Sequence, residues 1–131
     1  MAKRLTLRKK ERLKSRKAIE TLFSKGKSIK LMPYRVLYLF GEKGLQFGVG
    51  VSAKNFKKAA DRNRIKRLTR EAWRMQKTPL QELLQSQNKG LYIFFTYTSA
   101  EPAAYPTVRD AVQKILAKLM NMIYETGTSD T

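Results

Sequence analysis

The chain has 131 residues, of which 42% are hydrophobic, and it carries 28 Lys and Arg residues against 10 Asp and Glu residues. The formal charge of +18 favours binding to a polyanion, and the length fits one compact domain. Because cysteine and histidine are absent, disulfides, Cys/His zinc sites and Ser-His or Cys-His nucleophile pairs are excluded.

The predicted elements begin with a basic arm, residues 1–14, which shows no clear periodicity. No apolar run of signal-peptide or transmembrane length follows the arm, so we expect a cytoplasmic protein without membrane contact. A short helix is predicted between Ser15, which can cap its start, and Gly26, which can end it. Its apolar residues recur at helical spacing, so this helix should lie against a sheet.

Three segments have strand patterns: residues 34–40, 45–51 and 91–97. The compact segment 41–44 predicts an antiparallel hairpin between the first two strands. Alternation places Tyr34, Val36 and Tyr38 on one face of the first strand, and Tyr38 is expected at a surface or cleft. Gly48 and Gly50 alternate in the second strand, where either a ligand or a crossing helix could come close.

A basic helix is predicted after the loop 53–60, and it holds six Arg or Lys residues between positions 62 and 74. Its apolar residues Ile65, Leu68 and Ala72 fall within an arc of roughly 60°, whereas the basic residues cover roughly 140° on the opposite side. Only Asp61 and Glu71 could pair with the bases, so a merely solvated face fits poorly. The planar guanidinium group of Arg presents paired donors that match phosphate oxygens, so we interpret this helix as a nucleic-acid contact.

The last part of the chain predicts two more helices around the third strand. The basic helix should stop by about residue 77, and Thr78 and Gln81 form a possible capping box for a helix to about residue 87. A final helix begins near Pro106, with Gly127 just beyond its end. These elements predict an α/β fold class in which helices pack on a mainly antiparallel sheet. One domain should span residues 1–125, and residues 126–131 should be a disordered tail.

Catalysis by the protein alone is not favoured by these residues. The ten acidic residues are scattered singly, so no carboxylate cluster for magnesium is expected, and the segment 48–50 lacks the spacing of a phosphate-binding glycine loop. No catalytic residue and no metal ligand is therefore assigned to the protein. The single Trp73 is expected to pack under the helix end, with stacking on a base as the alternative.

The segment Arg-Asn-Arg-Ile-Lys-Arg-Leu-Thr-Arg-Glu-Ala-Trp at positions 62–73 resembles the hallmark helix of the protein component of bacterial ribonuclease P. Segments 12–14 and 19–28 are similar to the opening helix and turn of that family, and segments 36–38 and 48–52 are similar to its first two strands. The resemblance covers about residues 8–123. It implies an α+β sandwich of about four strands with a left-handed βαβ crossover, and it makes the domain of residues 1–125 an RNA-binding domain. That domain would bind a large catalytic RNA and assist in removing the 5′ leader of precursor tRNA. The RNA and its magnesium ions would perform the hydrolysis, with no obligatory protein partner.

The resemblance also implies roles for particular residues. The expected contacts with RNA come from Arg12, Lys57, Lys58, Arg62, Asn63, Arg64, Lys66, Arg67, Arg70 and Arg74. The expected lining of a sheet cleft for the leader is Ile19, Phe23, Val36, Tyr38 and Ser52. A ribosomal type of structured-RNA-binding protein without an enzymatic role is the main alternative, and a DNA-binding protein that uses the basic helix in a major groove is a third.

Overall fold

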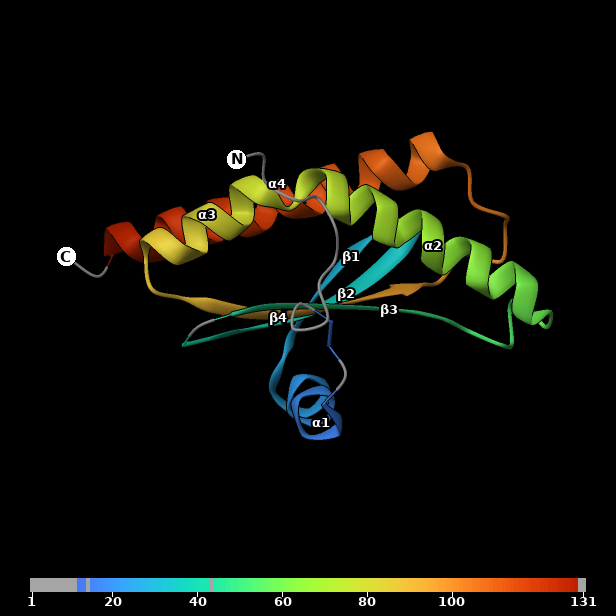
Figure 1. Ribbon diagram of the computed structural model, residues 1–131, viewed down its shortest axis with the longest axis horizontal. Coiled ribbons are helices and arrows are strands. Elements are labelled where there is room, and N and C mark those ends of the chain that lie inside the picture. The colour runs from blue at the N-terminus through green and yellow to red at the C-terminus, as the bar shows by residue number, and fades with distance from the viewer. Residues whose placement is uncertain (1–11, 14, 43, 130–131) are drawn as a thin grey trace, which may run out of the picture.

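In the computed structural model, one face of a four-stranded sheet carries three helices and the other carries one (Figure 1). The structure describes residues 12–13, 15–42 and 44–129, with the side chains of 126–129 left out. The elements in chain order are α1 (Arg16–Lys25), β1 (Lys27–Leu31), β2 (Tyr34–Gly41), β3 (Leu45–Val51), α2 (Ala59–Gln76), α3 (Thr78–Ser86), β4 (Gly90–Tyr97) and α4 (Tyr105–Ser129). The prediction of about four strands packed by helices is confirmed.

The sheet is mixed, with the strand order β1-β2-β4-β3, so the predicted hairpin between β2 and β3 is wrong. Strand β4 lies between them, antiparallel to β2 and parallel to β3. Its nearly continuous apolar sequence suits a central strand that is covered on both faces. The link between β2 and β3 passes the start of β4, where the Leu91 N–H donates to the Gly44 carbonyl at 2.8 Å, and Gly44 supplies a φ of +88°.

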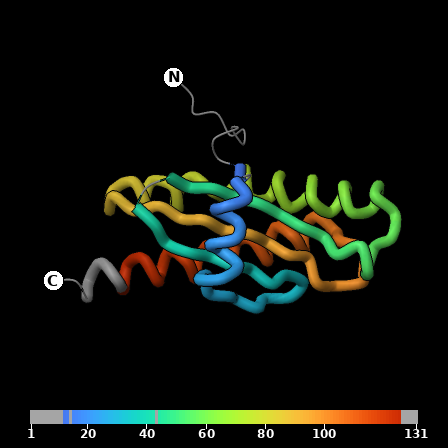
Figure 2. Tube along the Cα trace, turned by 90° about the horizontal axis from the view of Figure 1, so that it is seen from below, coloured from blue at the N-terminus to red at the C-terminus, as the bar shows by residue number. Residues whose placement is uncertain are grey.

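Strand β1 was not predicted, because its sequence Lys-Ser-Ile-Lys-Leu buries only Ile29. It pairs antiparallel with β2 and forms one edge of the sheet, and β3 forms the other. The connection from β3 through α2 and α3 to β4 passes behind the sheet as seen in Figure 2. It joins neighbouring parallel strands in the left-handed sense that the resemblance implied.

Helix boundaries follow local chemistry with two exceptions. The Ser15 side chain accepts a hydrogen bond from the Ala18 N–H, as predicted, and Gly26 ends α1. Helix α3 begins at Thr78 after Lys77, with no side-chain cap, so the predicted Thr78 capping box is wrong. Helix α4 runs on to Ser129, which includes positions 126–129 of the predicted tail, whereas residues 130–131 and most of the predicted arm lie outside the described residues.

The main core lies between the sheet and helices α2, α3 and α4. Trp73, Phe47 and Phe95 are at most 2% exposed, and the Trp73 ring stacks on Phe47 with centroids 4.7 Å apart. The predicted packing of Trp73 under the helix is thus confirmed. A second, smaller cluster under α1 is built on Leu13, Ala18 and Leu22. Because α1 alone crosses this face, much of the sheet beside it stays open (Figure 2).

Candidate nucleic-acid interface

Helix α2 presents a row of cations away from the sheet, because its apolar stripe holds Ile65, Thr69 and Ala72 in the core. Arg67 and Arg70 are exposed, and Lys66 is half-buried. Lys57 and Lys58 are exposed at the start of the helix, where Lys58 is the N-cap residue without a side-chain hydrogen bond. These positive charges stand close to the positive end of the helix dipole, and Asp61 is the one acidic residue of the first turn, so the start of α2 favours an anionic ligand.

Two of the predicted RNA-binding arginines, Arg62 and Arg64, donate hydrogen bonds to backbone carbonyls of the protein. The Arg62 guanidinium donates to the carbonyls of Phe56 and Lys57 at 2.7 and 2.8 Å, so it fixes the loop before α2. Arg64 donates to the Ala103 carbonyl at 3.2 Å and ties α2 to the segment before α4. These contacts give both side chains a structural role in addition to any contact with RNA.

Arg74 is held by an ion pair with Glu71 on the same helix, in which its Nε donates to Glu71 Oε2 at 3.2 Å. The hydrogen bond to Glu71 raises the pKa of the Arg74 guanidinium above its ordinary value. Because the carboxylate offsets its charge, Arg74 attracts phosphate less strongly than Arg67 or Arg70. The exposed Asn63 lies on the outer side of the helix near its start.

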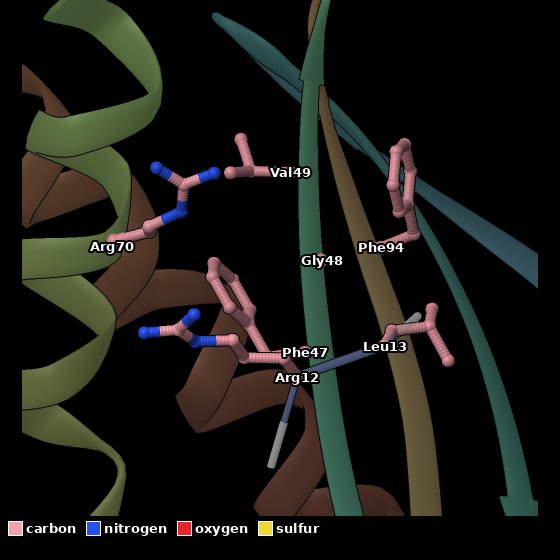
Figure 3. Close-up of a pocket in the computed structure, with 7 residues that line it drawn as sticks. All are labelled: Arg12, Leu13, Phe47, Gly48, Val49, Arg70 and Phe94. Atoms are coloured by element: carbon pink, nitrogen blue, oxygen red, sulfur yellow. The ribbon is translucent and has the colours of Figure 1, made fainter. Parts of the chain in front are cut away.

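A pocket of about 310 Å³ at the outer edge of β3 is lined by residues of the N-terminal segment, β3, β4 and α2. The Leu13 N–H donates to the Phe47 carbonyl at 2.8 Å, and Arg12 forms a parallel bridge with Phe47. Figure 3 shows the guanidinium groups of Arg12 and Arg70 on the α2 side of β3, with Leu13 and Phe94 on the other side. Two segments that are 58 positions apart therefore bring two planar cations to one sheet edge, an arrangement suited to a phosphate backbone.

An aromatic surface lies on the α1 side of the same strand. The ring of Phe94 lies over two glycines: a Cβ atom at Gly48 would come within 2.8 Å of the ring, and one at Gly50 within 3.0 Å. Phe23 of α1 meets Phe94 edge to face, with centroids 5.6 Å apart, and is 56% exposed. The glycines therefore let the Phe94 ring lie down on β3, where it is partly buried beside the more exposed Phe23.

The predicted leader cleft is wrong as one surface, because the sheet separates its members. Val36 and Tyr38 are 0% and 7% exposed in the main core, whereas Ile19 and Phe23 lie on the α1 side. Strand alternation forces this separation. Ser52 is occupied by the turn after β3, where its Oγ accepts from the Lys54 N–H at 3.1 Å.

Two residues on the open face were missed by the sequence reasoning, Phe94 and the exposed Arg35. Across the sheet, Thr96 of β4 pairs with Arg35 of β2 on one side and with Gly50 of β3 on the other. The neighbouring row on the same face consists of Leu37, Phe94 and Gly48. The signal was present, since Arg35 and Leu37 alternate with the buried Tyr34 and Val36. An arginine between large apolar residues marks the face that remains open to solvent.

Other kinds of site find little support. Among the residues that the structure describes, no three carboxylate side chains gather to hold a metal ion. None of the helices in the described part of the chain combines the length and apolarity needed to cross a membrane.

A family model described as Ribonuclease P matches residues 7–120. Two proteins from strains W83 and ATCC 33277 of Porphyromonas gingivalis, each named ribonuclease P protein component, are 39% and 38% identical over 117 residues. Each alignment covers 86% of this chain and 85% of the relative.

Solved structures show the same fold. The RNase P protein from Thermotoga maritima is 25% identical with a TM-score of 0.63, over 82% of this chain and 96% of that one. The RNase P protein from Staphylococcus aureus is 19% identical with a TM-score of 0.57, over 83% of this chain and 94% of that one.

Proposed function

Because the chain belongs to the ribonuclease P protein family, we propose that it binds the catalytic RNA through α2 and holds the 5′ leader of precursor tRNA on the α1 face of the sheet. The protein is a subunit of ribonuclease P, the enzyme that matures the 5′ end of tRNA. The observation that carries the proposal is the meeting of Arg12 and Arg70 at the β3 edge, beside the open aromatic face.

The leader is single-stranded, and single strands are held by cations for phosphate and by aromatic rings for bases. Arg12 and Arg70 bind phosphates where the leader passes the β3 edge. Phe94 and Phe23 stack on bases, and Arg35 binds a phosphate further across the sheet. Because the Phe94 ring covers Gly48 and Gly50, bases meet an aromatic surface there, and stacking on a ring tolerates any base.

The exposed cations of α2, together with Lys57 and Lys58, contact the catalytic RNA. The hydrolysis belongs to that RNA and to the magnesium ions it holds. The described residues of the protein do not fit a magnesium site, because their carboxylates do not cluster. The protein contributes by neutralising phosphate charge and by fixing the position of the leader, so its effect is greatest where magnesium is scarce.

A cleavage assay on precursor tRNA at low magnesium concentration tests this function. It compares bacterial catalytic RNA alone, the protein alone and the mixture. Cleavage at the mature 5′ end is expected only in the mixture. Tight RNA binding without any gain in cleavage would favour the ribosomal type of RNA-binding protein instead. Competition between RNA and duplex DNA separates both from a DNA-binding role.

The α2 surface is tested by the salt dependence of RNA binding. Arg67→Ala should reduce the slope of log affinity against log salt for catalytic RNA, and Arg70→Ala should reduce the slope for precursor tRNA. Each change should be roughly 0.7 to 0.9, the loss of about one phosphate contact. Arg109→Ala is the matched control, because Arg109 lies on α4 and is paired with Asp110. If all three variants keep the slope of the unmodified protein, Arg67 and Arg70 do not touch phosphate.

A further inference from the structure

A second pocket, of about 370 Å³, lies away from the pocket of Arg12 and Arg70 and shares no lining residue with it. It forms between the end of α1, the start of β1, strand β2 and helix α4, and it is called the corner below. Its lining is Lys25, Lys27, Tyr38, Leu39, Phe40, Met122 and Glu125. The volume falls in the range of about 300 to 1,000 Å³ that is typical of small-ligand sites.

The sheet edge is incomplete at this corner. Strand β1 begins at Lys27, which pairs with Tyr38, so Leu39, Phe40 and Gly41 of β2 extend beyond it with no neighbouring strand on that side. The half-buried Phe40 ring meets Tyr38 edge to face, with centroids 5.8 Å apart. A smaller pocket of about 210 Å³, which Lys89 and Ile123 help to line, adjoins the same ring. Phe40 therefore separates two adjacent pockets, each with at least one lysine in its lining.

The charges at the corner are positive on one side and negative on the other. Lys25 and Lys27 are exposed on the α1–β1 side, and neither forms an ion pair among the described residues. Glu125 is exposed on α4. A ligand that fits must combine an anionic group for the lysines, a flat apolar group for Phe40, and a hydrogen-bond donor for Glu125. An unpaired nucleotide has all three in its phosphate, its ring and the amino group of adenine, guanine or cytosine.

We propose that this corner is a second RNA site, which takes one unpaired nucleotide with its base against Phe40 and its phosphate on Lys25 and Lys27. Glu125 accepts a hydrogen bond from an N–H group of the base, an amino group in adenine, guanine or cytosine or the N3–H group in uracil. The inference rests on the proposed function, because an RNA partner supplies the nucleotide. It adds a contact far from α2 and from the pocket of Arg12 and Arg70, so the protein would hold RNA at two ends.

The experiment compares two double variants in complexes with catalytic RNA, with and without precursor tRNA. The double variant Lys25→Ala with Lys27→Ala removes the two positive charges from the lining of the corner pocket and leaves Glu125 in place. Lys114→Ala with Lys118→Ala removes two exposed charges from α4 and is the matched control. The corner variant should bind about five- to tenfold more weakly and lose about 0.7 of salt slope for each phosphate contact with a single strand. The control should change neither quantity.

Phe40→Leu tests the stacking contact while it keeps an apolar side chain at the edge of the core, and its melting temperature shows whether the fold is intact. A loss of about five- to tenfold in affinity is expected, the lower end of the stacking contribution of one base, because Leu keeps part of the apolar contact. Glu125→Gln keeps the size of the side chain but removes its charge, so it should weaken the hydrogen bond to the base and reduce protection of that nucleotide from chemical probes. A loss seen only with precursor tRNA would identify the substrate as the source of the nucleotide, and a loss with catalytic RNA alone would identify the enzyme's own RNA.

Two outcomes overturn the corner site and leave the proposed function standing. In the first, the corner and control variants bind RNA equally while Arg70→Ala is weakened. In the second, polyglutamate competes at the corner as well as a short single-stranded RNA does, which would make it a surface for any anion. If Arg70→Ala also binds normally and no cleavage is gained in the mixture, the proposed function fails as well.

Discussion

The two faces of the sheet use the same strands for different purposes. The face under α2, α3 and α4 is dry, and it buries Tyr34, Val36 and Tyr38 of β2. The face under α1 carries Arg35 and Leu37 from the same strand, and it leaves Phe23 of α1 more than half exposed. One helix cannot cover four strands. Burial that stabilises the fold is therefore concentrated on one face, and the other face keeps exposed side chains that can bind a ligand.

The contrast is tested most strongly by truncating one large aromatic residue on each face. Trp73→Ala on the closed face should cost roughly 3 to 5 kcal/mol of unfolding free energy, because the ring is fully buried against Phe47 and Phe95. Phe23→Ala on the open face should cost less than about 1 kcal/mol, since more than half of its side chain is already in water. Urea unfolding measures both. Equal costs would contradict the division of the two faces.

Binding of the leader to the open face is tested by comparing the affinities of two variants for precursor and mature tRNA. Phe94→Ala should weaken binding of precursor tRNA to the holoenzyme by roughly 1 to 3 kcal/mol, the value of one base stacked on an aromatic ring, with little change for mature tRNA. Tyr38→Ala, on the closed face, should reduce stability and affect both tRNAs alike, because Tyr38 is buried in the main core. Affinities for the two tRNAs decide the matter. If Tyr38→Ala weakened binding of precursor tRNA alone, the leader would contact the closed face, and its placement on the α1 face would be wrong.

The sequence predicts the elements of this fold better than it predicts their arrangement. The basic helix is well predicted, because its apolar stripe and its two ends depend on residues close together in the chain. The strand order depends on β4 entering between β2 and β3, a pairing between distant residues that no local pattern records. For β2, both faces carry apolar side chains, so alternation alone does not tell which face meets three helices. The assignment of Val36 and Tyr38 to the leader cleft was wrong for this reason, because their face of β2 is the one that the three helices bury.

The residues of the candidate site are likewise predicted only in part from the sequence. The cations of α2 could be named from sequence, since a charged helix face needs no tertiary information. Phe94 could not, because its position follows from the parallel register that sets it opposite Gly48. The contacts of Arg62 and Arg64 with backbone carbonyls also depend on the fold, in the case of Arg64 on a residue 39 positions away. Sequence therefore gave the chemistry of the interface, and tertiary structure decides which side chains are available.

The smallest expected effect concerns the polar contact inside the closed face. The Thr69 hydroxyl donates to the Ile65 carbonyl at 2.9 Å, so the Tyr34 hydroxyl donates to Thr69 Oγ1 at 2.6 Å. Tyr34→Phe removes this hydrogen bond but leaves Thr69 bonded to its own helix. The expected cost at neutral pH is therefore only about 1 kcal/mol, and RNA binding should not change. Thermal unfolding measures the cost.

The same variant has a distinct signature in alkali. Burial raises the pKa of Tyr34 to about 12, against an ordinary value of about 10 in the unfolded chain. The folded state thus retains the proton longer, so this contribution to stability is complete below about pH 10 and is lost as the pH rises through 12. Burial also raises the pKa of Tyr97, but that residue is present in both proteins and its effect cancels in the comparison. The advantage of the unmodified protein over Tyr34→Phe should therefore shrink between pH 10 and 12; a constant difference would mean that water reaches the Tyr34 hydroxyl and that the closed face is not dry there.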